Sequence, residues 1–171
     1  MVSQTITSKS AVGQVWELLG QVMDPEIPVI SVVDLGIVRD VREGPGELEV
    51  VITPTYTGCP ATRQIEQDIR TALAEAGFGD ARLTIVLSPA WTTDWISEAG
   101  RDKLVDFGIA PPAGNAGKAG KRALFGAEPS VACPQCGSRH TEMISEFGST
   151  PCKALWRCTG CREPFDYFKC I

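Results

Sequence analysis

Cys133-Pro-Gln-Cys136 and Cys158-Thr-Gly-Cys161 are two short motifs in which two residues separate a pair of cysteines. Two thiolates at this spacing can bind one metal ion from a single tight turn. A second turn of the same kind, about twenty residues further along the chain, completes a tetrahedral set of sulfur ligands. We therefore predict that these four cysteines hold one metal ion.

The doubled motif has the spacing of a zinc ribbon, and we interpret residues 130–171 as a small module that folds around zinc. A module of about forty residues rarely buries enough apolar surface to fold without a bound metal ion or another cross-link. A rubredoxin-like iron site uses the same four ligands, so both zinc and iron are open at this position. The alternatives are a chance spacing or two disulfides.

The composition narrows the class of protein. The chain has 171 residues, a hydrophobic fraction of 43% and a formal net charge of −5. The acidic excess argues against binding to the phosphate backbone of a nucleic acid, which needs a basic face. No apolar run is long enough for a membrane span, and residues 1–10 lack the apolar stretch of a signal peptide. We expect a cytoplasmic protein, in which reduced clustered cysteines bind metal.

The region before the cysteine motifs predicts an α+β domain at residues 1–110, with a small mixed sheet and packed helices. The expected helices are 11–22 after Ser10 as a cap, one that begins at Pro60 and ends before Gly77, and one that Ser97 caps and that runs to 107. The expected strands are 37–41, 48–53 and 81–88. Residues 111–129 are rich in Gly, Ala and Pro and predict a flexible linker before the ribbon.

Cys59 is the only cysteine of the first domain, and it precedes Pro60 at the predicted start of a helix. The N–H groups at a helix start stabilise a thiolate, so Cys59 is a candidate metal ligand or nucleophile. The alternative is a packed, inert thiol. A cysteine hydrolase would need a histidine beside the thiol, and the only histidine, His140, lies across the linker.

Carboxylates supply the other candidate ligands of the first domain. Asp24, Glu26 and Asp34 are the nearest partners for Cys59 by residue type. A thiolate with carboxylates suits iron better than acyl transfer. As single residues they could equally be turn formers and helix caps.

Cys152 and Cys170 exceed what one tetrahedral site needs. One interpretation is a second thiolate site for iron or a cluster, and the other is a small buried apolar side chain or a disulfide. We favour the second interpretation for Cys152 and weigh the two equally for Cys170. His140 is expected to be a surface group, because four cysteines already complete the coordination sphere.

Several longer motifs carry a family resemblance. The segments Asp24-Pro25-Glu26-Ile27-Pro28, Asp34-Leu35-Gly36-Ile37-Val38 and Thr53-Pro54-Thr55-Tyr56-Thr57-Gly58-Cys59-Pro60 resemble the domain of SufT-type iron–sulfur assembly factors. The segments 89–95, 146–154 and 165–170 resemble the D proteins of the bacterial phenylacetate-degradation system. The resemblance covers nearly all of the chain outside the linker.

The resemblance implies an accessory or maturation role beside a multicomponent monooxygenase that epoxidises the ring of phenylacetyl-CoA. The implied partners are the oxygenase or reductase subunits, with no nucleic acid and no membrane, and a homodimer is left open. Cys59 is the implied contact for iron or a labile iron–sulfur cluster, with Asp34 and Cys170 as further candidates. The remaining candidate partner or loop residues are Asp24, Glu26, Thr57, Trp91, Asp94 and Trp95.

Three functions follow from these observations. The leading hypothesis is a non-catalytic factor that holds iron or a labile cluster at Cys59 and docks its client through the zinc ribbon. The second is a structural subunit of the oxygenase complex that carries only zinc and transfers no metal. The third is an enzyme that uses Cys59 as a nucleophile.

Overall fold

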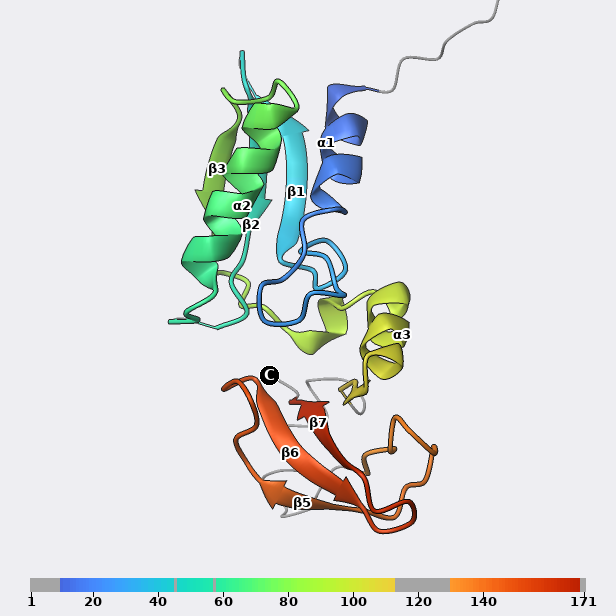
Figure 1. Ribbon diagram of the computed structural model, residues 1–171. Helices are drawn as coiled ribbons and strands as arrows, with labels where there is room; N and C mark the ends of the chain where they lie inside the picture. The colour runs from blue at the N-terminus through green and yellow to red at the C-terminus, as the bar shows by residue number, and fades with distance from the viewer. Residues whose placement is uncertain (1–9, 45, 57, 113–129, 170–171) are drawn as a thin grey trace, which may run out of the picture.

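The computed structural model describes residues 10–44, 46–56, 58–112 and 130–169. Within them the chain forms two small sheets with helices packed on the first (Figure 1). The elements are α1 Ala11–Leu19, β1 Val38–Glu43, β2 Leu48–Ile52, α2 Thr62–Glu75, β3 Arg82–Ile85, the 3₁₀ helix η1 Thr93–Trp95, α3 Glu98–Asp106, β4 Ile109–Ala110, β5 Thr141–Ser145, β6 Lys153–Cys158 and β7 Pro164–Phe168.

The first sheet has the strand order β1-β2-β3. β1 and β2 form the antiparallel hairpin that the sequence predicts, and β3 joins β2 in parallel. Such a parallel connection needs a crossover, which α2 provides. The helices α1 and α2 contact each other and bury Val15, Leu19, Ile65 and Ile69 against the sheet. The predicted α+β class with a mixed sheet is confirmed.

Two of the predicted helix starts are confirmed by their caps. The Ser10 hydroxyl accepts the N–H of Gly13, and the Ser97 hydroxyl accepts the N–H of Gly100. The helix predicted from Pro60 begins later, at Thr62, and Pro60 lies in the preceding turn.

The first helix is shorter than its apolar pattern predicts. It ends at Leu19 rather than at residue 22, because Val22 leaves the helix to pair with a later segment. The carbonyl of Val22 accepts the N–H of Val32 at 2.9 Å. This long-range pairing outweighs the local helical pattern.

The second sheet has the order β4-β7-β6-β5 and contains the ribbon. Its strand β4 comes from the end of the first domain, immediately after α3, and pairs in parallel with β7. The ribbon also shares the apolar core of the first domain, because Cys152 and Phe168 belong to that core cluster. The ring of Phe168 lies 6.3 Å from that of Trp91. The two modules are therefore packed together, a contact that the sequence does not predict.

The predicted linker at 111–129 lies almost wholly outside the described residues, as do Thr57 and Cys170. Over the part of the chain that the structure covers, none of the helices has the length and apolar character that a membrane crossing requires.

Gly36 is the position where the backbone leaves no room for a side chain. Its φ is +69°, and a Cβ atom there would lie 2.6 Å from the Trp95 carbonyl oxygen. We expect Gly36→Ala to lower the free energy of unfolding by about 3 kcal/mol, because left-handed strain adds to steric overlap.

Gly46→Ala is the matched control. Gly46 also has a positive φ, +90°, but nothing lies within 4 Å of a Cβ atom built there. It should lose only the strain term of about 1 kcal/mol. Denaturant titration of both variants measures the difference, and equal losses would show that the Trp95 contact does not matter.

Candidate functional site

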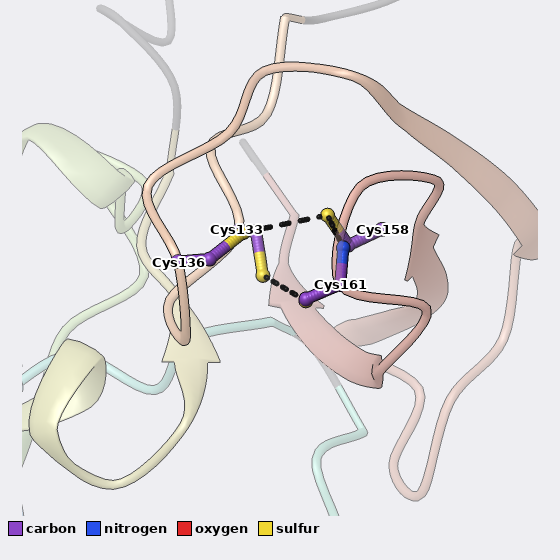
Figure 2. A group of neighbouring side chains, drawn as sticks. All are labelled: Cys133, Cys136, Cys158 and Cys161. Carbon is purple, nitrogen blue, oxygen red and sulfur yellow. Dashed lines mark hydrogen bonds between the residues drawn. The ribbon is translucent and has the colours of Figure 1, made fainter.

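The four cysteines of the two sequence motifs converge between two turns of the ribbon. Their sulfur atoms all lie within 4.8 Å of one another. The four side chains come together from the two turns (Figure 2). Cys133 Sγ lies 3.7 Å from Cys161 Sγ, and Cys136 Sγ lies 3.6 Å from Cys158 Sγ. The predicted group of four thiol ligands is therefore assembled in the fold.

The two turns are built alike. In each, the residue after the second cysteine adopts a left-handed conformation, Gly137 with φ +72° and Arg162 with φ +68°. In the first turn the N–H of Gly137 donates to the Cys133 carbonyl at 2.9 Å. In the second the N–H of Cys161 points at Cys158 Sγ at 3.4 Å. Both turns thus bring two sulfur atoms to the same side of the backbone.

The pKa values of Cys158 and Cys161 indicate that a cation is needed to ionise all four cysteines. The backbone N–H of Cys161 lowers the pKa of Cys158 to about 6. The N–H of Glu163 acts in the same direction on Cys161, but desolvation and the sulfur atoms of Cys136, Cys158 and Cys133 outweigh it and raise the pKa of Cys161 to about 12. Four adjacent thiols ionise together only when a metal ion compensates the charge. A Cys₄ tetrahedron fits zinc or iron, which thiolates favour.

Cys59 lies in the turn that leads into α2 and is partly buried. Its N–H donates to the Tyr56 carbonyl at 3.2 Å, and its own carbonyl accepts the N–H of Thr62 at 3.2 Å. The side chain lines a small pocket of about 20 Å³ between the first domain and the ribbon. A volume of about 10–15 Å³ admits one water molecule, so the pocket has room for one water molecule or one ion of similar size.

Asp24 and Glu26 line the same pocket. Asp24 Oδ1 accepts the N–H groups of Glu26 and Ile27, both at 2.8 Å, so this buried carboxylate also shapes the turn. Desolvation by burial raises the pKa of Asp24. Desolvation and then the nearby Asp24 charge raise the pKa of Glu26. The structure thus brings together Cys59 and two of the three predicted carboxylates.

Asp34 is held in a different network. Its Oδ1 accepts the Ser97 hydroxyl at 2.8 Å, and its Oδ2 accepts the Ser31 hydroxyl at 3.0 Å and Lys103 Nζ at 2.6 Å. Desolvation opposes ionisation, but the bonds from Lys103, Ser97 and Ser31 outweigh it and lower the pKa of Asp34. Asp34 does not line the pocket of Cys59. Its contacts fix α3 against the preceding loop.

The predicted tryptophans pack rather than point into the pocket. The indole N–H of buried Trp91 donates to the Leu35 carbonyl at 2.9 Å. The Arg39 guanidinium lies over the ring of Trp95, with its central carbon 3.4 Å from the ring centre. Asp94 is exposed at η1. His140 is exposed and is not part of the converging ligand group, in agreement with the prediction.

Cys152, for which the sequence favoured a structural role, also lines the pocket. It is 8% exposed, as expected for a small buried side chain, but it lines the pocket together with Cys59. Desolvation by burial raises the pKa of Cys152. Desolvation, the two thiols and Glu26 raise the pKa of the nearby Tyr56. The surplus of cysteines over ribbon ligands was the only sequence signal for this arrangement.

Both modules match known protein families. Residues 13–85 match the family model described as iron–sulfur cluster assembly protein, and residues 117–169 match the model described as PaaD zinc beta ribbon domain. The chain is 50% identical over 160 residues to a protein of Escherichia coli (strain K12) that is named as a subunit of 1,2-phenylacetyl-CoA epoxidase. That match covers 94% of this chain and 93% of the relative.

The chain belongs to the PaaD family. The first domain of this PaaD-family chain has further relatives. It is 41% identical over 78 residues to the Fe-S protein maturation auxiliary factor SufT of Staphylococcus aureus (strain USA300), covering 44% of this chain and 88% of the relative. A crystal structure of a domain of unknown function, DUF59, from Bacillus anthracis superposes with a TM-score of 0.50 at 26% identity. It covers 54% of this chain and 90% of the other.

The ribbon of this PaaD-family chain should lose its fold with its metal. We expect Cys158→Ser to reduce bound metal from one ion per chain to less than half, because the remaining thiols no longer complete a tetrahedron. Metal analysis and circular dichroism of the full chain measure both effects. His140→Ala is the control and should keep its metal. A Cys158→Ser protein with full metal content would contradict the four-sulfur site.

Two substitutions of Asp24 distinguish the contribution of its hydrogen bonds to stability from the contribution of its charge. Asp24→Ala should lower the free energy of unfolding by about 2 kcal/mol, because two backbone N–H groups lose their acceptor. Asp24→Asn keeps that acceptor and removes a charge that burial disfavours, so it should be at least as stable as wild type at pH 7.

The pH dependence follows from the raised pKa of Asp24. Wild-type stability should fall relative to Asp24→Asn as pH rises from the ordinary value of 3.8 through the raised value, because only the ionised form is penalised by burial. Thermal unfolding from pH 4 to pH 7 measures this difference. The prediction is contradicted if Asp24→Asn loses stability relative to wild type between pH 4 and pH 7.

Proposed function

We propose that this chain is a cytoplasmic accessory factor of the phenylacetyl-CoA epoxidase system that delivers iron or an iron–sulfur cluster to the oxygenase or its reductase. Two similarities support the proposal. The relative that covers 94% of this chain is named as a subunit of that epoxidase, and a relative that matches 78 residues is named as an Fe-S protein maturation auxiliary factor.

The observation that carries the delivery role is the environment of Cys59. This partly exposed thiol shares a pocket with Asp24 and Glu26, and sulfur with carboxylate oxygen is a ligand set that iron accepts. Among the described residues, only the ribbon cysteines already converge as three or more ligands within 4.8 Å. The Cys59 pocket is therefore not pre-assembled, and it should bind its cargo weakly enough to release it.

The ribbon is proposed to hold zinc permanently and to dock the client. Its edge strand β5 and the following turn expose Met143, Ile144 and Phe147 by 44%, 52% and 64%. Next to them Glu142 and Arg157 form an exposed ion pair. An apolar surface with mixed charges suits a protein partner better than a nucleic acid, which requires a basic surface.

A nucleophilic enzyme is the weaker interpretation of Cys59. Nucleophilic cysteines are activated by a neighbouring base, most often histidine. The only histidine of the chain, His140, lies exposed in the ribbon beyond the first motif. The pocket carboxylates have raised pKa values because burial disfavours their charge, which suits metal binding with proton release.

Cys59→Ser tests the delivery role directly. Epoxidase and reductase produced together with this variant should contain less than half of the iron that the wild-type chain supports, because the cargo contact is lost. Gln67→Ser, an exposed substitution on α2, is the matched control and should support full iron content. Iron and acid-labile sulfide of the purified clients are the readout.

The structural-subunit hypothesis predicts the opposite result. It requires co-purification of the chain with the oxygenase and full iron content of the clients in the Cys59→Ser background. That result would end the delivery proposal. Zinc content and thermal stability of the variant must equal those of wild type for the comparison to hold.

A further inference from the structure

We infer that the cargo site is shared between the two modules: Cys152 of the ribbon and Cys59 of the first domain together bind one thiophilic divalent ion in the pocket between them. This inference rests on the proposed function, in which Cys59 contacts the cargo, and adds the second sulfur ligand. It assigns to the ribbon a direct part in cargo binding besides its docking role.

Cys152 is separated from the ribbon's own metal group. It precedes β6, and the ligand Cys158 ends the same strand, so the two cysteines lie at opposite ends of β6. A strand rises about 3.3 Å per residue, which puts these residues roughly 20 Å apart. Cys152 therefore cannot join the ribbon's four-sulfur site, and its thiol faces the core of the first domain instead.

The backbone holds Cys152 firmly at this place. Its carbonyl accepts the N–H of Lys169 at 3.0 Å, and the N–H of Lys153 closes a turn on the Thr150 carbonyl at 3.0 Å. The Thr150 hydroxyl lies 3.0 Å from Cys152 Sγ. Packing of Phe168 against Trp91 fixes the same end of the ribbon to the first domain. The second thiol is thus positioned by the folded ribbon.

The charge of the pocket suits a cation. Cys59, Cys152, Asp24 and Glu26 all line it, and they offer two sulfur atoms and two carboxylates as ligands. Lys153, which is buried, acts on Asp24, Glu26 and Cys152, but it also pairs with Asp166 on β7 at 3.7 Å. Its charge is therefore shared between the pocket and Asp166. A divalent ion would supply the balance by replacing the two thiol protons, which pass to solvent.

The size of the pocket selects a single ion over a preformed cluster. A volume of about 20 Å³ accepts roughly one water-sized species, whereas a cluster of several iron and sulfur atoms needs far more space. Two sulfurs with carboxylate oxygens favour Fe²⁺, Co²⁺ or Zn²⁺ over Mg²⁺ and Ca²⁺. Under the proposed function the physiological ion is Fe²⁺.

The test uses the full chain with zinc in the ribbon, handled without oxygen. Equilibrium dialysis against Fe²⁺ should give one iron per chain beyond the zinc. Cys59→Ser and Cys152→Ser should each weaken iron binding by at least about tenfold, since loss of even an outer-sphere contact to a metal site costs 10–100-fold. Gln67→Ser, an exposed substitution on α2 at a residue that does not line the pocket, is the control and should bind iron as wild type does.

X-ray absorption of Co²⁺ bound to the zinc-loaded wild-type chain provides a readout that needs no variant. It should show two sulfur neighbours around the pocket cobalt. A single sulfur, or a Cys152→Ser protein that binds iron like wild type while Cys59→Ser does not, would overturn the shared site and leave the proposed function standing. Iron binding that ignores both cysteines would overturn the proposed function as well.

Discussion

Charge compensation among four crowded thiols is the constraint on which the rest of this structure depends. Sulfur atoms within 4.8 Å of one another cannot all ionise unless a cation joins them. A metal ion bound to them would join the turn before β5 to the turn between β6 and β7. Cys152, just before β6, and Phe168, at the end of β7, pack in the core of the first domain, so such an ion would help to position the pocket beside Cys59.

The two sulfur sites differ in the degree to which the fold prepares them. The ribbon cysteines are assembled by two turns of like geometry, and a closed Cys₄ site of that kind binds its metal tightly. The thiols of the pocket come from separate modules, and their neighbours are the buried Asp24 and the partly exposed Glu26, whose pKa values desolvation raises. Under the proposed function, such a site would have to gather its ligands around the ion, which would lower affinity and suit exchange with a client.

Polar networks hold the first domain in the shape that this interface requires. Asp34 joins Ser31, Ser97 and Lys103, and through them anchors α3 to the loop after the first helix. α3 then leads through Gly108 into β4, which is the first strand of the ribbon sheet. Asp34, a candidate iron contact by residue type and by family resemblance, therefore holds α3, the helix that leads into the ribbon sheet, against the loop after α1.

The sequence by itself determined the elements whose signals are local. Serine caps, the hairpin of β1 and β2 and the doubled cysteine motif follow from short-range patterns, and each is found in the fold. The tertiary structure alone decided the end of α1, the pairing of β4 with β7 and the meeting of Cys59 with Cys152. These depend on contacts between residues far apart in the chain, and neither spacing nor periodicity records which distant segments will pack together.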